Sequence, residues 1–377
     1  MTARPVPSRV GEAGLGLALV ADLLGRDLQR AARAAGSPAA LWALDAAGMA
    51  RLLRLDAEDA ARLAGWDRRA ALTAARVHLQ EHGATLVGAA GAPAAPPRLG
   101  AIYDPPLALF AEGDWCAAAA RMAESPVIAV VGSRRPSAAG RAFARELAAA
   151  LTARGALVVS GLALGVDAAA HEGALDAGGH TVAVLGAGLA HGYPRANAHL
   201  RARIRRAGCL LSEYWLDTPP APWRFPARNR IVAGLAHAVV VVEAGARSGA
   251  LITADFALEA GRPVLAVPGA PWSDGSEGCN ALIRAGAALC CGVDDVVAEV
   301  AHPGWRDDAA VPAELPEGFP AEVHARLREA PRRVDELAGA LGRDAASVSA
   351  ALALLEMDGH VLRGEGQRYW ATPRAAR

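Results

Sequence analysis

The residues best suited to chemistry in this chain are arginines in short loops that also contain glycine and serine. One such loop runs from Gly132 to Arg135, and a second runs from Gly245 to Gly249. These loops present backbone N–H groups together with guanidinium groups, and both bind anions such as phosphate. We therefore expect a phosphate-binding site that includes Gly132, Ser133, Arg134, Arg135, Arg247, Ser248 and Gly249.

A third arginine-rich segment surrounds Phe225 and Asn229. Its arginines are Arg224, Arg228 and Arg230, and we expect all of them in a loop that leads into a helix. Arginine beside an aromatic ring and an amide suits a single-stranded nucleic acid, because the guanidinium binds phosphate while the ring stacks on a base. A mononucleotide needs only one phosphate-binding loop, so the two loops and this segment together favour a polymeric ligand.

These loops require a scaffold, and the hydrophobic pattern predicts one. Five continuous apolar runs, each followed by a loop and separated by helical patterns, are typical of parallel strands covered on both faces. The runs comprise residues 127–131, 156–159, 181–185, 238–242 and 264–267. The fold class we expect is therefore α/β, with an extended Rossmann-like, doubly wound sheet that binds its ligand at the carboxyl ends of its strands.

Composition divides the chain into three expected domains. Residues 1–85 are rich in alanine, leucine and arginine and lack strand patterns, which predicts a small helical domain of the SAM or helix-hairpin-helix type. Proline-rich stretches at 91–97 and 302–320 mark the limits of a sheet domain, which we expect at residues 86–300. We expect a third domain at residues 313–377.

The third domain begins with a helix-turn-helix pattern and ends with a hairpin. Val348, Leu352 and Leu355 line one face of the second helix, and residues 364–366 separate two short strand patterns. We therefore expect a winged-helix domain. Acidic and basic residues balance between positions 316 and 377, so contact with a protein is at least as well supported as binding to DNA.

Bulk properties argue against several classes of protein. The 377 residues carry no net charge, and all 39 basic residues are arginine, which excludes mechanisms that need a lysine. The 5 cysteines include no C-x-x-C pair, so we expect no metal site and no disulfides, but reduced thiols in a cytoplasmic protein. The apolar run from Gly14 to Ala21 ends at Asp22 and is too short for a membrane anchor, so we expect no contact with a membrane.

The loop from Gly186 to Gly192 is similar to a dinucleotide-binding fingerprint but does not match it. Its third glycine comes one position late, and Tyr193 and Pro194 interrupt the helix that would receive the pyrophosphate. We therefore expect neither a nicotinamide nor any other cofactor.

Motifs in order along residues 96–292 resemble the DNA-processing protein DprA (Smf) family. They are Gly132-Ser133-Arg134-Arg135, Ser160-Gly161-Leu162-Ala163-Leu164-Gly165-Val166-Asp167 with His171, Leu185-Gly186-Ala187-Gly188, Tyr193-Pro194, Leu211-Ser212-Glu213-Tyr214, Phe225-Pro226-Ala227-Arg228-Asn229-Arg230-Ile231, Val242-Glu243-Ala244, Ser248-Gly249 and Pro268-Gly269. The helical front part and the winged-helix tail also agree with longer members of that family.

This resemblance implies a protein without known catalysis that binds single-stranded DNA irrespective of sequence. Such a protein protects incoming DNA during natural transformation, helps it past single-strand-binding protein and loads the RecA recombinase. The resemblance also adds Gly161 to the expected DNA contacts. Family members often use lysines in this pocket, and here Arg224 or Arg247 would replace them.

The family forms dimers through the end of its sheet domain, so the resemblance implies a homodimer. Candidate contacts are Leu282, Ile283 and Leu289, although ordinary core packing explains these three residues equally well.

Five further residues are expected to orient loops rather than to bind DNA. Asp167 and His171 stand four positions apart on one helix, which predicts a helix cap or a hydrogen-bonded pair. We expect Glu243 to orient loop amides or an arginine, and Pro268 and Gly269 to shape the loop after the last long strand.

An enzyme is the alternative function. The stretch from Glu243 to Thr253 also resembles nucleoside-monophosphate phosphoribohydrolases, which carry a Pro-Gly-Gly-x-Gly-Thr loop followed by a catalytic glutamate. Here the corresponding loop reads Glu243-Ala244-Gly245-Ala246-Arg247-Ser248-Gly249. The next acidic residues, Asp255 and Glu259, do not stand at the position of the catalytic glutamate. We therefore expect no catalysis, while a nucleotide-binding or phosphoribohydrolase-like enzyme stays as the alternative.

Overall fold

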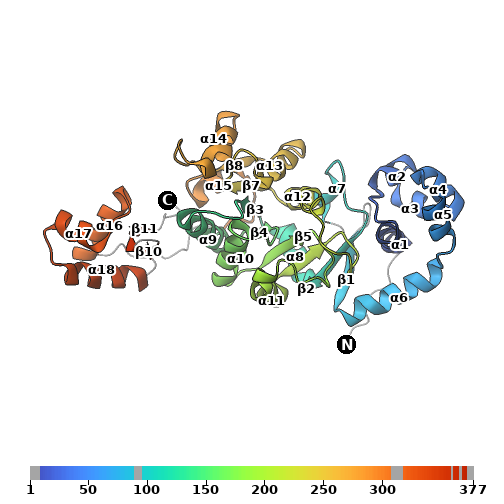
Figure 1. Cartoon of the computed structure of the whole chain (residues 1–377), viewed down its shortest axis with the longest axis horizontal. Helices are drawn as coiled ribbons and strands as arrows, with labels where there is room; N and C mark the ends of the chain where they lie inside the picture. Colours follow the sequence, from blue (N-terminus) through green and yellow to red (C-terminus); the bar gives the residue numbers. More distant parts are fainter. Residues whose placement is uncertain (1–8, 89–95, 307–316, 358–359, 365–366, 372–377) are drawn as a thin grey trace.

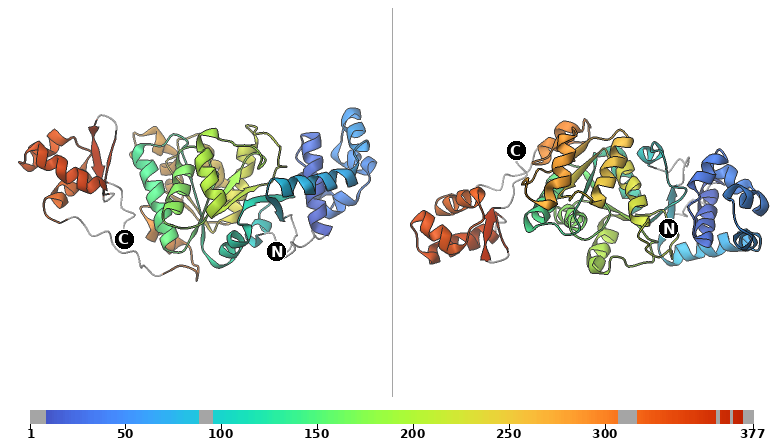
Figure 2. Two further views of the ribbon diagram at one scale, coloured as in Figure 1. Left: turned by 90° about the horizontal axis from the view of Figure 1, so that it is seen from below. Right: turned by 45° about the horizontal axis from the view of Figure 1, so that its top comes forward.

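The computed structural model describes residues 9–88, 96–306, 317–357, 360–364 and 367–371. Three parts follow one another along the chain: N-terminal helices in blue, a central sheet domain, and a C-terminal domain in red (Figure 1). The N-terminal helices and the C-terminal domain lie at opposite ends of the sheet domain in every view (Figure 2). Most of both expected proline-rich stretches, and Glu365 and Gly366 of the expected hairpin turn, lie outside the described residues.

One nine-stranded sheet organises the central domain, in the order β1-β2-β6-β5-β4-β3-β7-β8-β9. Its strands are β1 (Ala84–Gly88), β2 (Leu109–Gly113), β3 (Val127–Gly132), β4 (Leu157–Ser160), β5 (Thr181–Leu185), β6 (Cys209–Ser212), β7 (Ala238–Val242), β8 (Val264–Ala266) and β9 (Ala288–Leu289). In the sheet, the strands β6, β5, β4, β3, β7, β8 and β9 run parallel to one another. Strands β1 and β2 form an antiparallel edge beside β6.

The five expected strands are confirmed as β3, β4, β5, β7 and β8. The chain moves outward from β3 through β4 and β5 to β6, and then returns to β7 on the other side of β3. The carboxyl ends of β3 and β7 therefore form the topological switch point, where an open α/β sheet leaves a crevice for a ligand. The loops after Gly132 and Val242, which carry the expected phosphate-binding residues, both start at this crevice.

Helices cover both faces of the sheet, as the continuous apolar strands require. Ile128 and Val130 of β3 face one helical layer, and Ala129 and Val131 face the other. The first layer contains α9 (Ala138–Ala153), α10 (Val166–Asp176) and α15 (Val293–Glu299). The second contains α8 (Trp115–Glu124), α12 (Arg224–Leu235), α13 (Gly249–Glu259) and α14 (Glu277–Arg284). Two further helices, α7 (Pro97–Gly100) and α11 (Ala198–Ala207), complete the domain.

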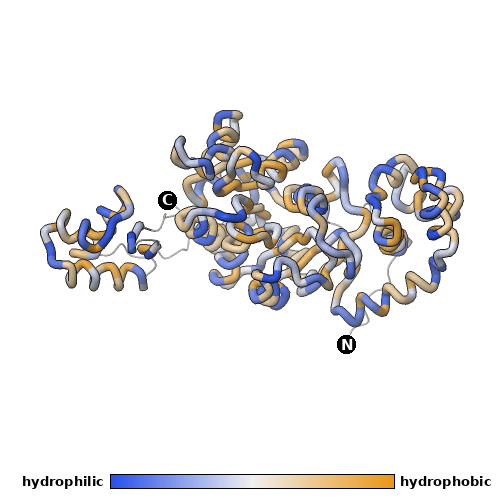
Figure 3. The backbone as a smooth tube through the Cα atoms, in the orientation of Figure 1, coloured by the Kyte–Doolittle hydropathy of each residue, from blue (hydrophilic) through white to orange (hydrophobic). Residues whose placement is uncertain are grey.

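Six helices precede the sheet: α1 (Arg9–Leu24), α2 (Gln29–Ala34), α3 (Pro38–Ala43), α4 (Ala46–Leu53), α5 (Ala57–Ala64) and α6 (Arg68–Glu81). They enclose a core that includes Leu17 and Met49, and α1 is largely hydrophobic along its length (Figure 3). Leu15 of α1 and Leu79 of α6 instead pack with Phe110 of β2. The expected domain boundary at residue 85 falls within β1, so these helices continue directly into the edge of the sheet.

The C-terminal domain has its own hydrophobic core. It consists of α16 (Phe319–Glu329), α17 (Val334–Leu341), α18 (Ala345–Met357) and the antiparallel strands β10 (Val361–Arg363) and β11 (Tyr369–Ala371). Val348, Leu352 and Leu355 are buried as expected, and the three helices followed by a hairpin form a winged helix. The first helix, α16, had not been expected from the sequence.

No single helix in the described ranges is long and apolar enough to cross a membrane. Helices α17 and α18 pass the same test only as a pair, and they bend by 113° where they meet.

Candidate nucleic-acid interface

A cleft of about 530 Å³ opens where the loops after β3, β4 and β7 meet the first turns of α12 and α13. Every expected DNA-contacting residue lines it except Arg224 and Arg230. The expected residues that do so are Gly132, Ser133, Arg134, Arg135, Gly161, Phe225, Arg228, Asn229, Arg247, Ser248 and Gly249. Tertiary structure thus gathers segments that lie more than a hundred residues apart into one site.

Three arginine side chains are available to a ligand in this cleft. Arg134, Arg135 and Arg247 are exposed, and none of them forms an ion pair within the described ranges. Arg134 and Arg135 come from the loop after β3, and Arg247 comes from the loop after β7, so they face the cleft from neighbouring strands. Unpaired guanidinium groups of this kind can each bind one phosphate.

Phe225 provides the aromatic wall of the cleft. The Arg134 guanidinium carbon lies 5.6 Å from the centre of its ring, and the centre of the Tyr193 ring lies 5.4 Å from it. A Cβ atom at Gly186 would lie 2.6 Å from Cδ1 of Phe225, so only glycine leaves room for the ring in this position. Tyr193 had been noted only as part of a motif, and its packing against Phe225 is a contact that the sequence did not indicate.

Arg228 forms the floor of the cleft and is only 4% exposed. Its Nη1 donates hydrogen bonds to the backbone oxygens of Gly161 and Val184, and its Nε donates to Oδ1 of Asn229. A Cβ atom at Gly161 would lie 2.4 Å from Nη2 of Arg228, which explains the glycine there. Arg228 therefore joins three segments of the protein besides bordering the site.

Asp167 holds the loop beneath the cleft in place. Its carboxylate accepts hydrogen bonds from the backbone N–H groups of Gly161, at 3.1 Å, and Ala163, at 3.2 Å. Burial raises the pKa of the Asp167 carboxyl, while the positive charge of Arg228 acts in the opposite direction. Asp167 therefore neither caps α10, whose N-cap is Gly165, nor pairs with His171; its carboxylate holds the loop that precedes the helix.

His171 is fully buried and faces Thr181 instead of Asp167. Its Nδ1 lies 2.7 Å from the Thr181 hydroxyl, and that hydroxyl donates to the Val158 backbone oxygen at 2.8 Å. Nδ1 therefore carries the proton in this contact. Burial, assisted by the charge of Arg228, lowers the pKa of His171 to about 3, so the imidazole is neutral at ordinary pH.

Glu243 ties the loop after β7 to the start of α9. Its carboxylate accepts a hydrogen bond from the Ser137 backbone N–H at 2.7 Å and another from the Ser137 hydroxyl. The same hydroxyl accepts from the Gly140 backbone N–H at 3.0 Å. The N-terminus of α9 is thus occupied by groups of the protein itself, and in the first loop the guanidinium groups are left to bind an anion.

The N-terminus of α13, by contrast, borders the cleft. Ser248 caps this helix by accepting a hydrogen bond from the Ala250 backbone N–H at 3.3 Å. The Asn229 side chain donates to the Gly249 backbone oxygen at 3.2 Å, so the amide expected to contact DNA also fastens α12 to α13. Arg247, Ser248 and Gly249 thus line the cleft together, and their binding of phosphate stays a prediction.

The loop after β8 is held by a reciprocal pair of hydrogen bonds. The Asn280 side chain accepts from the Gly269 backbone N–H at 3.2 Å and donates to the Gly269 backbone oxygen at 2.9 Å. A Cβ atom at Gly269 would lie 2.0 Å from Oγ of Ser276, so the loop requires glycine there. Pro268 and Gly269 thus belong to a shaped loop that flanks the cleft without lining it.

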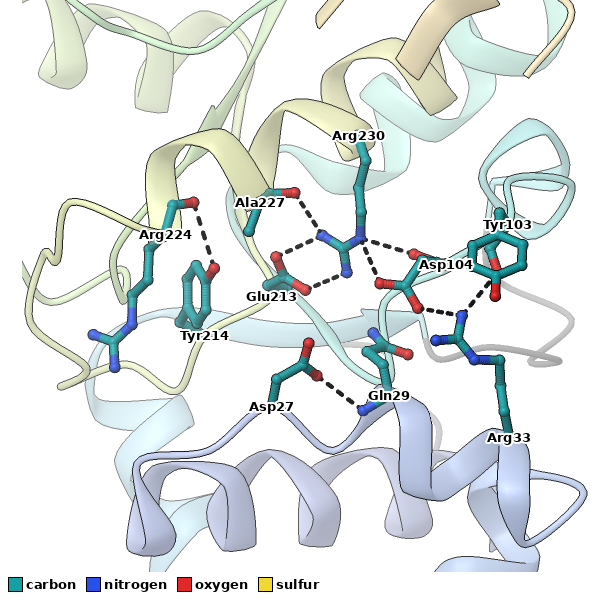
Figure 4. A network of polar contacts seen from close by, with 10 residues as sticks. All are labelled: Asp27, Gln29, Arg33, Tyr103, Asp104, Glu213, Tyr214, Arg224, Ala227 and Arg230. Carbon is teal, nitrogen blue, oxygen red and sulfur yellow. Dashed lines mark hydrogen bonds and ion pairs between the residues drawn. The ribbon is translucent and has the colours of Figure 1, made fainter. Parts of the chain in front are cut away.

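Arg224 and Arg230 lie elsewhere, which corrects the expectation that they share the cleft (Figure 4). Arg230 makes paired hydrogen bonds of 2.8 and 2.6 Å to the Glu213 carboxylate, and its Nε donates to the Asp104 backbone oxygen at 2.8 Å. These acidic neighbours raise the pKa of Arg230 although burial opposes the rise. Arg224 stacks against the rings of Tyr214 and Trp223, at 5.1 and 5.0 Å.

The helical geometry of this segment explains why the arginines separate. The segment expected to be a loop is in fact the first half of α12, which begins at Arg224. Residues two positions apart on a helix point in nearly opposite directions, so Arg228 faces the cleft while Arg230 faces away from it. Arg230 and Arg224 line a second cavity of about 360 Å³, which lies between α12 and the N-terminal helices.

The candidate dimer residues lie at the β9 end of the sheet. Leu282 and Ile283 belong to α14 and are half-buried against the central core, while Leu289 of β9 is 46% exposed. Strand β9 is the edge of the sheet and pairs only with β8 among the described strands. The participation of Leu282, Ile283 and Leu289 in a dimer stays a prediction.

The fold and the cleft define a class of protein: an open α/β domain with an arginine-lined and aromatic-lined crevice at its switch point, followed by a winged helix. A family model described as DNA recombination-mediator protein A matches residues 89–301, and one described as DprA winged helix domain matches residues 307–367. The chain belongs to the DNA recombination-mediator protein A family, which confirms the resemblance found in the motifs.

Two relatives give the extent of the likeness. Protein Smf of Escherichia coli is 45% identical over 203 residues, which is 54% of this chain and 53% of that protein. A putative DNA processing protein DprA of Mycobacterium tuberculosis is 44% identical over 253 residues, 65% of each chain. The aligned part of this chain thus spans about half of the first relative and about two thirds of the second.

Two solved structures are similar to this one. DNA processing protein A of Streptococcus pneumoniae superposes with a TM-score of 0.64 at 33% identity, over 79% of this chain and 99% of that chain. DNA processing protein A of Helicobacter pylori, whose single-stranded DNA binding mode that structure describes, gives 0.51 at 29% identity, over 57% and 94%.

Proposed function

We propose that this protein binds single-stranded DNA in the cleft without sequence specificity. The observation that carries the proposal is that one crevice combines the half-buried ring of Phe225 with Arg134, Arg135 and Arg247, which form no ion pair within the described ranges. Guanidinium groups bind phosphates, and an aromatic ring accepts any base on its face. A duplex keeps its bases stacked inside, so a site built on ring stacking favours a single strand.

The position of the arginines also supports a polymer. Arg134 and Arg135 follow β3, Arg247 follows β7, and these two strands are direct neighbours in the sheet. Neighbouring strands are about 4.8 Å apart, a separation comparable to the spacing of successive phosphates along one strand. Two loops side by side can therefore hold consecutive phosphates of the same chain.

The wider role that we infer follows from the family. The protein protects incoming DNA during natural transformation and recombination, helps it past single-strand-binding protein and loads the RecA recombinase, in the cytoplasm. Membership of the recombination-mediator family and the DNA-processing names of the relatives support this role. A homodimer through Leu282, Ile283 and Leu289 belongs to the same proposal.

The C-terminal winged helix is assigned to a protein partner in this proposal. Helix α18 occupies the position of a recognition helix, yet it contains no arginine. A helix without positive charge is poorly suited to the phosphate-lined major groove.

A nucleotide-processing enzyme is the less supported alternative. Glu243, which would be the acidic residue nearest the loop of a phosphoribohydrolase, is bound to Ser137 at the start of α9 and does not line the cleft. The acidic side chain that does line it, Asp167, is buried and bonded to backbone N–H groups. Neither carboxylate is free to act as a general acid or base.

Fluorescence polarisation of a labelled dT oligonucleotide about 16 nucleotides long tests the proposal. Wild-type protein is titrated at two salt concentrations, with unlabelled single-stranded and duplex competitors. Arg134→Ala is compared with Arg206→Ala, an exposed arginine at the end of α11, on the opposite edge of the sheet. We expect single-strand preference, and a salt slope that Arg134→Ala lowers by about 0.7 to one and Arg206→Ala leaves unchanged.

Absence of binding, or equal slopes in all three proteins, would overturn the proposal. Binding of mononucleotides with release of free base would then favour the enzymatic alternative.

A further inference from the structure

A large aromatic side chain close to the cleft is left in water. Trp272 is 86% exposed, in the loop between β8 and α14. It is not among the residues that line the cleft, and the sequence did not single it out. A lone exposed ring is not a binding site by itself, so its position has to decide its role.

The loop that carries Trp272 packs against the loop that carries Arg247. The Gly278 backbone N–H donates to the Ala244 backbone oxygen at 2.7 Å. The Asp274 backbone oxygen lies 3.2 Å from where a Cβ atom of Gly245 would be. Trp272 therefore stands on the same carboxyl edge of the sheet as the cleft, one strand beyond Arg247, on a loop that is fixed from both sides.

A second exposed aromatic side chain stands at the other end of this edge. Tyr193, in the loop after β5, is 44% exposed and packs against Phe225. The strands run β5, β4, β3, β7, β8 across the edge, so the loops of Tyr193 and Trp272 are four strand spacings apart. At about 4.8 Å per spacing the separation is roughly 19 Å, and Arg134, Arg135 and Arg247 lie between.

The chemistry of the Trp272 loop suits a base better than a phosphate. The loop contains Asp274 and continues into Glu277, and both are exposed acids that repel phosphate. Its attractive element is the face of the indole, which accepts any base by stacking. The arginines between the two aromatic ends supply the phosphate contacts that the loop lacks.

We infer that Trp272 is a base-stacking platform at one end of a single-stranded DNA path that crosses the carboxyl edge of the sheet. The path begins at Tyr193 and Phe225, passes the three arginines and ends on the Trp272 ring. About six nucleotides at the stacked rise of 3.4 Å cover this length, and fewer cover it if the strand is extended. The inference rests on the proposed function, and it adds a binding residue outside the cleft.

The test compares Trp272→Ala and Trp272→Phe with the wild-type protein in full-length form. Labelled dT oligonucleotides of about four and about 16 nucleotides are titrated by polarisation at several salt concentrations. Tyr103→Ala is the matched control, because Tyr103 is an 83% exposed ring that packs on Arg33 at the N-terminal helices, away from the cleft. Arg134→Ala reports separately on the cleft.

We expect Trp272→Ala to weaken binding of the longer oligonucleotide by about five-fold or more, with an unchanged salt slope. The shorter oligonucleotide, which the cleft can hold alone, loses less affinity. Trp272→Phe keeps most of the binding because it keeps a ring. The longer oligonucleotide also quenches part of the wild-type tryptophan emission, and Trp272→Phe lacks that part of the change.

Three results would overturn the inference. Equal affinity of Trp272→Ala and wild type at both lengths removes Trp272 from the path while leaving the proposed function intact. A loss accompanied by a change from dimer to monomer in sedimentation identifies Trp272 as a contact between protein copies. A wild-type protein that binds neither oligonucleotide, or binds irrespective of Arg134, overturns the proposed function itself and the path with it.

Discussion

The arginines around the cleft differ in what they are free to do. Arg134, Arg135 and Arg247 are exposed, whereas Arg228 is 4% and Arg230 is 7% exposed. The exposed group can bind phosphates, and the buried pair satisfies carbonyl and carboxylate oxygens inside the protein. In the sequence all five belong to segments that also contain glycine or an aromatic residue, and only burial separates the two groups.

Arg228→Ala is expected to destabilise the protein. The substitution leaves the Gly161 and Val184 backbone oxygens without their donor, and an unsatisfied buried carbonyl costs about 1–3 kcal/mol. Urea unfolding should give a loss of roughly 2–4 kcal/mol, and DNA affinity should fall with the loss of the cleft floor. Arg206→Ala, the exposed control, should unfold like wild type. Unchanged stability of Arg228→Ala would mean that its hydrogen bonds are replaced by water.

Glu146 predicts a pH dependence of stability. Burial on α9 raises the pKa of its carboxyl from 4.5 to about 8. Between these values the folded protein holds a proton that the unfolded chain has lost, so the free energy of unfolding falls as pH rises through this window. Glu146→Gln removes this effect. In thermal unfolding it should stabilise the protein clearly at a pH above 8 and much less below pH 5. An equal change at both pH values would contradict the prediction.

At the level of elements, the cleft depends on how the β5 loop and α12 fit together. Phe225 is the second residue of α12, and its ring lies over Gly186 at the end of β5. The helix is held from the other side by the pairing of Arg230 with Glu213 and Asp104 (Figure 4). Because α12 takes part in both sets of contacts, the position of the aromatic wall depends on both sides of this helix.

Gly186→Ala tests this positioning without removing any ligand contact. The added methyl group would lie 2.6 Å from Cδ1 of Phe225, so the ring must shift from its position in the cleft wall. We expect oligonucleotide binding to weaken by about three- to ten-fold, since stacking on one ring contributes about 1–3 kcal/mol per base. Gly192→Ala is the control, because no atom of the described residues lies within 4 Å of its added carbon. Equal binding of the two variants would show that the ring adjusts freely.

At the scale of the whole molecule, the C-terminal domain is the part most independent of the rest. Val323, Leu337 and Val348 belong to a core of its own. The sheet domain is completed by the segment ending at Arg306, which exchanges backbone and side-chain hydrogen bonds with Arg154. A chain truncated after Arg306 therefore keeps the contacts that close the sheet domain.

Truncation after Arg306 should leave affinity for single-stranded DNA within a few-fold of the full chain, because the cleft and its arginines lie wholly before that residue. Polarisation of the labelled dT oligonucleotide measures this, with circular dichroism as the check on folding. If a folded truncated protein lost ten-fold or more of its affinity, the winged helix would contribute to DNA binding, most directly through the basic residues of its hairpin.

The sequence by itself determined five of the seven parallel strands of the central sheet, and the loops that follow them. Apolar runs of four or five residues can form little else when helical patterns separate them, and loops after parallel strands must meet at one edge. Strands β6 and β9 were not predicted, and β9 has only 2 residues, too few for a strand pattern. Strand β1, which directly follows a helical region and pairs with β2, was not predicted either.

Only the tertiary structure decided which functional groups point into the cleft. Arg228 and Arg230 look equivalent in the sequence, but the helix turns one towards the cleft and the other towards Glu213. Glu243 looks free to bind or catalyse, but the start of α9 lies against it. Side-chain direction and the partners of buried charges depend on residues distant in the chain, so local patterns can name the segments of a site without showing which of their atoms a ligand meets.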